Sequence, residues 1–459
     1  MKLRNQIPLL LILLVLQVTA FADKTDDFMR AQIEWKHIPG AAVVVVRNGK
    51  IIKAKGYGFA SLEFDVPAEA NTVFEIGSVT KQFTAACIMM LVQDGKINLD
   101  APVSTYLDGT PEDWAPITVR MLLTHTSGIP SYTRIGGFEL WRRYTAKDAV
   151  EELAKHPMDF APGEKYLYNN SAFNLLGYII EKASGMTYWQ FLRTRIFIPL
   201  GMSDSNNRDP QFLLKRRANG YEYEDGAYHG RDGNLTDLFS AGAIVSTVND
   251  MAKWEIALEG DKFLNEKSKA EMWRKQKLNS GEELNYGFGW ILGDFRGEKT
   301  ISHSGQTAGF AANFSRFVDK GITVIVLSNS GTQGAGTELA RGVAKVYIPN
   351  ISIRAMKPIE DKNVAETAQF RNDFERMLNG DDFSKRATEP LFRKLHSAET
   401  KAEFTNLKKN GNVQSFKRAE SDGKGNTIFR VLTKKNAYLV RFAQTADGKL
   451  KDFTLLEIE

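Results

Sequence analysis

Apolar residues are spaced in two different ways along the chain, and the spacing predicts where strands and helices lie. Residues 41–47 form a β-rich apolar run, and Asn48-Gly49 separates it from a second run that ends at Gly58. Asn-Gly between two such runs is typical of a tight hairpin. Over residues 78–92 the apolar spacing becomes helical, and Asp94-Gly95 is typical of a helix end. A hairpin followed by a helix is therefore predicted for the first hundred residues.

Helical spacing dominates the middle of the chain, and strand-like runs return later. Strands at both ends with helices between them predict one mixed antiparallel sheet flanked by helices, with an inserted helical subdomain. The helical segments are 118–123, 146–155, 172–183, 250–259 and 337–346, and the later β-rich runs are 286–292, 300–303, 310–317 and 322–327.

Composition changes after residue 348. Residues 349–363 carry two prolines and mixed charges and are interpreted as a linker between a first domain, 23–348, and a second one. A small α+β accessory domain is predicted over 364–459, without a recognisable set of catalytic residues. Its helical pattern covers 364–378, and its β-rich runs are 413–420, 427–433, 437–442 and 453–459.

The first 22 residues have the pattern of a secretory signal peptide. Lys2 and Arg4 precede an apolar run over residues 9–16, and Ala20-Phe21-Ala22 fits a small-x-small cleavage site. We expect export to the periplasm or the medium, without strong membrane association after cleavage. The apolar run is shorter than the ~20 residues that a membrane-spanning helix needs, and an uncleaved anchor is the alternative.

Composition excludes several function classes. The 459 residues carry a formal charge of +5, and loss of Lys2 and Arg4 with the signal would leave +3, which is too little to indicate a nucleic-acid partner. The six histidines are scattered without metal-ligand spacing, so neither a metal nor a cofactor is expected. Cys87 is the only cysteine, which excludes an internal disulfide, and its apolar surroundings predict a buried packing residue.

Candidate chemistry begins with Gly-Ser-Val-Thr-Lys at residues 77–81. Three residues are just under one helical turn, so a helix starting near Ser78 would place its hydroxyl beside the Lys81 amine. A serine hydroxyl needs a neighbour that accepts its proton, and a partly desolvated lysine can become that neighbour. The pair indicates acyl transfer through a covalent seryl intermediate. Because Ser-x-x-Lys also occurs by chance, this interpretation depends on partners elsewhere in the chain.

A first set of partners is Tyr168-Asn169-Asn170, which comes just before a helical run. Tyr168 can act as a general acid or base. Asn170 can contact a substrate amide or Lys81. Alone, the run would be interpreted as a turn with an aromatic packing residue.

A second set is His303-Ser304-Gly305, at the end of a predicted strand. Gly305 has no side chain, so another molecule can lie close to that strand edge. The backbone N–H of Gln306 can join that of Ser78 in an oxyanion hole. His303 can orient a substrate carboxylate or assist proton transfer.

Together, Ser78-Val-Thr-Lys81, Tyr168-Asn-Asn170 and His303-Ser-Gly305 resemble the three motifs of serine β-lactamase-like hydrolases in order and spacing. The branch is similar to the one that contains class C β-lactamases, D-alanyl-D-alanine carboxypeptidases, D-aminopeptidases and related esterases. The resemblance covers about residues 26–348 and includes the flanking runs at 122–128, 241–242 and 286–290.

This resemblance implies a β-lactamase/transpeptidase-like α/β (α+β) fold. It also implies roles for the motif residues, with Ser78 as nucleophile and Lys81 as a proton acceptor that works with Tyr168. Asn170 and the strand at 303–306 would hold the substrate. Whether lysine or another group takes the first proton stays open.

The third motif departs from that of class C β-lactamases, which carry Lys-Thr-Gly or Lys-Ser-Gly where this chain has His303-Ser-Gly. A neutral imidazole attracts a β-lactam carboxylate less than a lysine ammonium does. The expected substrates are therefore peptides of the D-amino-acid or cell-wall type, including peptidoglycan stem peptides, or small esters. A β-lactamase proper and a penicillin- or peptidoglycan-binding sensor without turnover remain the alternatives. An α/β-hydrolase is disfavoured because the chain has no Gly-x-Ser-x-Gly.

Overall fold

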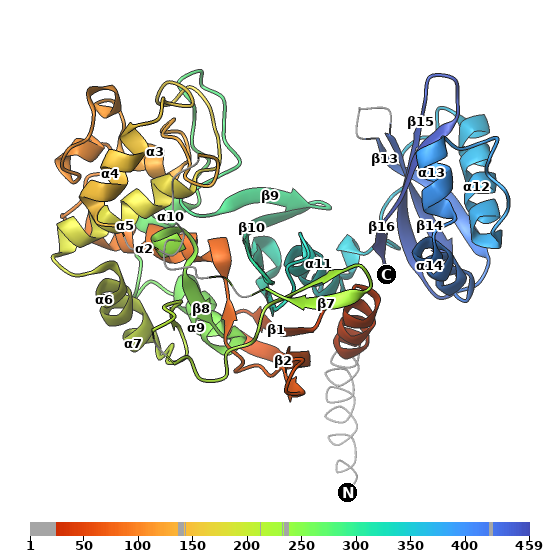
Figure 1. The fold of residues 1–459 in the computed structure, drawn as a ribbon, viewed down its shortest axis with the longest axis horizontal. Coiled ribbons are helices and arrows are strands. Elements are labelled where there is room, and N and C mark those ends of the chain that lie inside the picture. Colours follow the sequence, from red (N-terminus) through yellow and green to blue (C-terminus); the bar gives the residue numbers. More distant parts are fainter. Residues whose placement is uncertain are drawn as a thin grey trace, which may run out of the picture. The chain divides into compact units, whose positions relative to one another are not determined.

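The computed structural model describes residues 24–135, 142, 144–211, 213–231, 233, 238–421 and 426–459. The predicted signal peptide, residues 1–22, lies outside these residues. The chain divides into two units, Met1–Tyr347 and Ile348–Glu459 (Figure 1). Among the described residues, no helix is both long and apolar enough to cross a membrane.

The first unit is built on a seven-stranded antiparallel sheet with the order β3-β2-β1-β12-β11-β10-β9. The tight hairpin is confirmed, since Asn48 and Gly49 connect its first two strands with φ of 48° and 71°. The sheet also joins both ends of the unit as predicted, because Val43 lies opposite Val326. The strands are β1 Gly40–Arg47, β2 Lys50–Ser61, β3 Val66–Pro67, β9 Ile291–Phe295, β10 Glu298–Thr307, β11 Phe310–Phe317 and β12 Ile322–Ser328.

The central strands are buried on both faces, which explains their unbroken apolar sequence. Every residue of β12 is buried, and so is every residue of β1 except Arg47. Helix α11 (Ala335–Tyr347) packs against β11 and β12, and helix α9 (Val248–Glu259) packs against β1 and β12. Strands covered in this way need apolar residues at consecutive positions.

A helical region is inserted between the early and late strands, as predicted. Its central helix α2 (Thr80–Gln93) is buried from Thr80 to Leu91 and packs against α5 and α8. The other helices are α3 Val119–Leu123, α4 Ala146–Ala154, α5 Asn170–Ser184, α6 Tyr188–Leu192, α7 Ile198–Leu200, α8 Phe239–Gly242 and α10 Glu266–Met272. Short strands complete the unit: β4 Phe74–Glu75, β5 Asn206–Asn207 and β8 Ile244–Ser246 form one sheet, and β6 Tyr221–Glu224 pairs with β7 Ala227–Gly230.

One predicted strand is shifted. The run at 286–292 was expected to be extended, but β9 covers only Ile291–Phe295. The preceding residues pack their backbone tightly instead: a Cβ at Gly287 would lie 2.1 Å from the Met272 carbonyl oxygen, and one at Gly289 would lie 2.5 Å from that of Lys81. Gly289 also has φ of +74°, which takes the chain out of an extended conformation.

In the residues that the structure describes, the second unit is a four-stranded antiparallel sheet, β13-β14-β15-β16, with helices α12, α13 and α14. Apolar side chains from both layers form its core, with Phe370, Phe429 and Phe442 in mutual ring contact. Ile353 packs into a smaller apolar cluster of this unit beside Ala437. The elements are α12 Val364–Asn379, α13 Glu389–Leu395, α14 Ala398–Lys408, β13 Val413–Ser421, β14 Asn426–Thr433, β15 Ala437–Gln444 and β16 Leu450–Ile458. Helices α13 and α14 are not among the elements that the apolar spacing predicts.

Candidate active site

Ser78 lies in a tight turn that connects β4 to α2. Residues Gly77–Val79 form a single 3₁₀ turn, and the α-helix starts at Thr80, two residues later than the spacing predicted. Gly77 has φ of +50°, a conformation that favours glycine. The turn leaves Ser78 partly exposed, whereas Lys81, one helical turn further on, is 0% exposed.

The Lys81 amine contacts three oxygen atoms. Its Nζ lies 3.1 Å from Ser78 Oγ, and it donates to Asn170 Oδ1 and to the Ala241 carbonyl oxygen, each at 2.8 Å. Burial lowers the pKa of Lys81 well below its usual 10.5. A neutral amine has two protons and one lone pair. When the two protons go to Asn170 and Ala241, the lone pair is left for the proton of Ser78.

Tyr168 and Asn170 come from the start of α5. Asn169, between them, caps this helix because its Oδ1 accepts from the Ala172 N–H at 2.9 Å. The Tyr168 ring lies 4.9 Å from Lys81 Nζ. Burial raises the pKa of the Tyr168 phenol and the Ser78 side chain lowers it in part, yet the buried phenol oxygen has no hydrogen bond of normal geometry within the described residues.

His125 contacts the loop that carries Tyr168 and Asn169, a role that the sequence did not indicate. Its φ of +59° is typical of a residue in a tight turn. Its Nδ1 accepts the backbone N–H of Asn169 at 3.0 Å, and its ring packs 4.4 Å from that of Tyr168. Burial, followed by the charge of Lys81, lowers the pKa of His125 well below 6.5, so the ring is neutral and able to accept at Nδ1.

On the opposite side of Ser78, strand β10 lies directly against the nucleophile turn. A Cβ at Gly305 would lie 1.9 Å from the Ile76 carbonyl oxygen and 3.1 Å from the backbone nitrogen of Ser78. A Cβ at Gly77 would lie 2.7 Å from the backbone nitrogen of Gln306. The space at Gly305 is therefore filled by this chain's own backbone and not by another molecule. The same packing brings the Ser78 and Gln306 amides to one place.

The His303 ring is uncharged and both of its nitrogens bond within the protein. It is 2% exposed, with Nδ1 2.6 Å from the Ser304 carbonyl oxygen and Nε2 3.0 Å from the Tyr286 hydroxyl. A carbonyl only accepts, so we assign the proton to Nδ1 and let Nε2 accept from Tyr286. Burial, followed by the charge of Lys81, lowers the pKa of His303 to about 3. A neutral ring whose two nitrogens are already engaged is poorly suited to hold a substrate carboxylate.

The structure thus brings together every residue that the sequence singled out: Ser78, Lys81, Tyr168, Asn170, Gly305 and the Gln306 amide lie around one point, and His303 lies behind it. The Ala241 carbonyl is an addition, for which the only sequence signal was the flanking Ala241-Gly242 pair. Within the described ranges, no group of His, Cys, Asp and Glu side chains could hold a metal ion.

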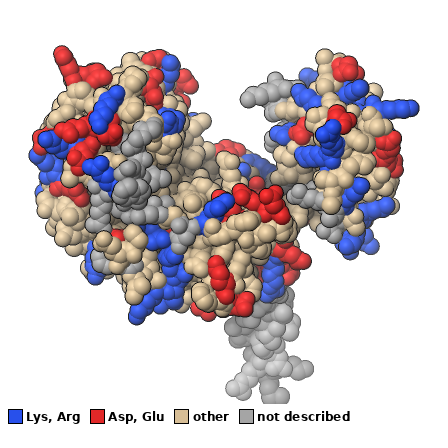
Figure 2. All heavy atoms as spheres, viewed as in Figure 1, with Lys and Arg blue, Asp and Glu red and all other residues tan. Residues whose placement is uncertain are grey.

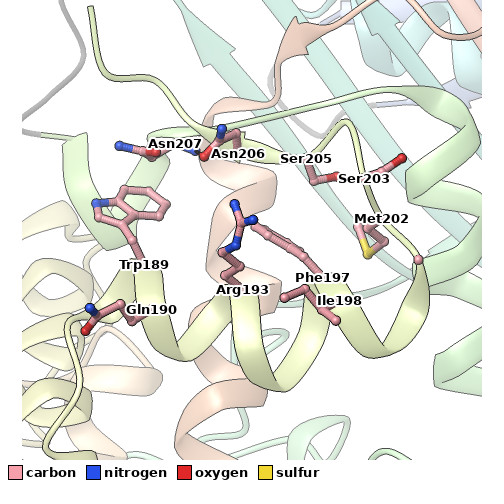
Figure 3. Close-up of a pocket in the computed structure, with 11 residues that line it drawn as sticks. Trp189, Gln190, Arg193, Phe197, Ile198, Met202, Ser203, Ser205, Asn206 and Asn207 are labelled. Carbon is pink, nitrogen blue, oxygen red and sulfur yellow. Dashed lines mark hydrogen bonds between the residues drawn. The ribbon is translucent and has the colours of Figure 1, made fainter. Parts of the chain in front are cut away.

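An open pocket of about 590 Å³ lies elsewhere on the first unit and contains none of these residues. Figure 3 shows Arg193 extending across it between Trp189 and Ile198, with Asn206 and Asn207 above. Over the face drawn in Figure 2, basic and acidic side chains are interspersed on the first unit.

Comparison with known proteins places these residues in a family context. The sequence profile of the Beta-lactamase family matches residues 25–347. Penicillin-binding protein 4* of Bacillus subtilis (strain 168) is 31% identical over 315 residues, which cover 64% of this chain and 69% of the relative. The D-amino acid amidase of Ochrobactrum anthropi SV3, solved with L-phenylalanine amide, has a TM-score of 0.64 and 26% identity, covering 72% of this chain and all of the amidase chain (100%).

A further solved structure extends over both units. The octameric penicillin-binding protein homologue from Pyrococcus abyssi has a TM-score of 0.63 and 25% identity, and the match covers 94% of each chain. The first unit, Met1–Tyr347, makes up 347 of the 459 residues, so part of this match falls in the second unit.

Proposed function

Because this chain belongs to the Beta-lactamase family, whose profile spans its whole first unit from residue 25, we propose that it is a serine hydrolase that forms an acyl-enzyme on Ser78. The observation that carries the proposal is the buried Lys81 amine, 3.1 Å from Ser78 Oγ and oriented by Asn170 and Ala241. An amine held in this way accepts the serine proton without first losing one of its own to water.

In the first half of the reaction, Ser78 Oγ attacks the substrate carbonyl carbon while its proton passes to Lys81 Nζ. The carbonyl oxygen becomes an oxyanion, which the N–H groups of Ser78 and Gln306 stabilise. The tetrahedral intermediate collapses, and the leaving amine or alcohol takes a proton from Lys81 or through the Tyr168 phenol. An ester of Ser78 remains.

In the second half, water attacks this ester with the same residues in the reverse roles. Its proton goes to the Lys81–Tyr168 pair, and Ser78 Oγ recovers a proton as the acid product leaves. Burial favours the uncharged form of both residues before the reaction, since it lowers the pKa of Lys81 and raises that of Tyr168.

We propose D-amino-acid amides or peptides, cell-wall stem peptides included, and small esters as substrates. The similarity to the D-amino acid amidase supports the amides within this range. The neutral, internally bonded His303 disfavours β-lactams, whose carboxylate a lysine would attract more strongly. Residues 1–22 support export as part of the same proposal.

The test is a substrate panel on the purified protein and on Ser78→Ala. The panel contains p-nitrophenyl acetate, a D-alanyl-D-alanine peptide, D-phenylalanine amide and a chromogenic cephalosporin. We expect hydrolysis of the esters, amides or peptides, a loss of at least about 10³-fold in Ser78→Ala, and slow or absent cephalosporin turnover. The matched control is Ser268→Ala, which removes another buried serine, in α10.

Each other outcome corrects a specific part of the proposal. Activity that survives in Ser78→Ala overturns the nucleophile. A stable adduct on Ser78 by mass spectrometry without product release favours the sensor alternative. Cephalosporin hydrolysis as fast as that of the best ester or amide favours a β-lactamase.

A further inference from the structure

A buried carboxylate lies three residues before the nucleophile. Glu75 is 1% exposed, in β4, and it accepts hydrogen bonds at both of its oxygens. Arg208 Nε donates to Oε1 at 3.0 Å, and Thr307 Oγ1 donates to Oε2 at 2.7 Å. A carboxylate removed from water needs such partners, and the largely buried guanidinium of Arg208 compensates its charge.

The three residues come from three segments that meet beside Ser78. Glu75 ends β4, and Ser78 lies in the turn that follows. Arg208 directly follows β5, and its N–H donates to the Ala243 carbonyl oxygen at 2.7 Å. Thr307 ends β10 and is the next residue after Gln306. The Glu75 carboxylate therefore connects the segment that carries the Ser78 N–H to the segment that carries the Gln306 N–H, the two candidate oxyanion donors.

The backbone between these anchors is closely packed, so the spacing of the two segments is tightly coupled. Ile76 lies against Gly305, and Gly77 lies against Gln306, at distances that leave no room for a Cβ. Ile76 N–H also donates to the Ile244 carbonyl oxygen at 3.1 Å, which fixes the other edge of β4. A small movement of β4 relative to the end of β10 would change the separation of the Ser78 and Gln306 amides directly.

We propose that Glu75 is a positioning residue, which sets the oxyanion hole by holding the nucleophile turn against the end of β10 through Thr307 and Arg208. It acts through these partners and does not touch the reacting atoms. This inference rests on the proposed function, because it presumes that Ser78 and Gln306 bind the oxyanion. Oxyanion donors must lie 2.7–3.1 Å from the oxygen, and displacement by about 1 Å can cost on the order of 10²-fold in rate.

The same unit contains a matched control. Glu255, in α9, is also 1% exposed; its Oε1 accepts from both Arg316 Nε, at 3.1 Å, and Thr323 Oγ1, at 2.9 Å. Glu75 and Glu255 are thus both buried carboxylates held by one arginine and one threonine. The Glu255 group joins α9 to β11 and β12 and includes none of the candidate catalytic residues. If Glu75 served only the stability of the fold, its substitution should lower kcat no more than substitution of Glu255 does, once the folded fraction is measured.

The experiment compares Glu75→Gln, Thr307→Val and Glu255→Gln with the parent protein. At position 75, glutamine keeps the size of the side chain but can accept from only one of the two donors, because these are at different oxygens and its NH₂ faces the other. We expect kcat for p-nitrophenyl acetate to fall about 10- to 100-fold in Glu75→Gln and in Thr307→Val, with KM within about threefold of the parental value. Affinity for an arylboronic acid, whose tetrahedral adduct on Ser78 places an oxygen in the oxyanion hole, should fall by a similar factor. Glu255→Gln should change neither quantity by more than about threefold once the folded fraction is measured.

A second variant keeps the test decisive if Glu75→Gln folds poorly. Glu75→Gln combined with Arg208→Gln removes both charges, so neither is left buried without its partner. If this double variant is folded and kcat remains low, the positioning role holds. If the double variant is folded and its kcat equals that of the parent, the proposal is wrong. It is also wrong if Glu255→Gln lowers kcat as much as Glu75→Gln does. Failure of the proposed function would look different, as activity that persists in Ser78→Ala.

Discussion

The two sides of the candidate site work in different ways. On the helix side, Ser78, Lys81, Tyr168 and Asn170 present side chains to one another, and Lys81 Nζ lies within 3.1 Å of three different oxygens. On the strand side, β10 contributes backbone. Gly305 and Gln306 lie against the turn of Ser78, while the side chain of His303 bonds to Tyr286 and to Ser304 within the protein.

This difference teaches which changes each side tolerates. The helix side depends on the chemical identity of its side chains, because one proton must move between them. The strand side depends on shape, because its donors are present at any residue and only their placement matters. We therefore expect two classes of substitution: those that remove a proton-transferring side chain and those that displace the backbone donors.

Lys81→Met should have the largest effect. Methionine keeps much of the length and apolar character of the buried side chain but cannot accept the Ser78 proton. We expect kcat/KM for the best ester substrate to fall by about 10⁴-fold, measured by steady-state hydrolysis. Lys269→Met is the control, since Lys269 is also largely buried, in α10, and pairs with Asp261. Near-parental activity in Lys81→Met would show that Lys81 does not accept the Ser78 proton, so the helix side would not depend on this side chain.

Gly305→Ala should come next, as the test of shape on the strand side. Its Cβ would lie 1.9 Å from the Ile76 carbonyl oxygen, so β10 and the nucleophile turn must separate. We expect kcat to fall by about 10³-fold, as when an oxyanion donor is lost, together with a lower melting temperature. Gly293→Ala in β9 is the control, because its Cβ would meet only Thr300 Oγ1, at 3.3 Å. If Gly305→Ala and Gly293→Ala had the same kcat and melting temperature, the position of β10 against the Ser78 turn would not matter for catalysis.

Tyr168→Phe should have a smaller effect, because Lys81 shares the proton transfers. The ring and its packing on His125 are kept, and only the phenol oxygen is lost. A decrease of about 10²-fold in kcat is expected. Tyr178→Phe serves as the comparison, since that hydroxyl donates to the Tyr144 carbonyl oxygen and not to the site. An unchanged kcat in Tyr168→Phe would assign all proton transfer to Lys81.

His303→Gln should change kcat/KM by less than about tenfold, the smallest catalytic effect in this series. The pKa of about 3 keeps the imidazole neutral throughout the working range, so it supplies no charge and no ionisation near neutral pH. The measurement is a pH–rate profile from pH 5 to 9. If a limb near pH 6.5 were present in the parent and absent in the variant, His303 would belong to the chemical side of the site after all.

The same histidine should affect stability at low pH. In the unfolded chain an imidazole titrates near 6.5, and in the folded protein His303 titrates near 3. Between these values the unfolded state binds the extra proton, so stability falls as the pH drops below about 6.5, and the effect is absent above it. From pH 7 to pH 5 the parent should lose about 2 kcal/mol more than His303→Gln does in urea unfolding. Equal losses would mean that His303 titrates normally in the folded protein.

Much of this site could be predicted from sequence, because its helix side is made of side chains at short, fixed spacings. Ser78 and Lys81 are one helical turn apart, and Tyr168 and Asn170 precede a clear amphipathic helix. The closure of the sheet by β1 and β12 followed from two apolar runs at opposite ends of the unit.

The rest could not be predicted because backbone contacts outside the three motifs have no sequence signature. The Ala241-Gly242 pair flanks the resemblance but does not identify the Ala241 carbonyl as an acceptor for Lys81, and the Asn169 N–H has no residue type that marks it as a donor to His125. The packing of Gly305 onto Ile76 is also a long-range contact, so its glycine suggested space for a ligand. The 286–292 run has strand-like residues, but close contacts at Gly287 and Gly289 override that preference.

The pairing of β1 with β12 also constrains how the chain can acquire its structure. Val43 has no sheet partner on that side until Val326 exists, so synthesis from the amino terminus must nearly complete the first unit before the central sheet can close. Contacts between residues so distant in sequence are entropically costly to form and slow folding. During synthesis, the unbroken apolar run of β1 stays available to holding chaperones, and to wrong strand partners when those are scarce.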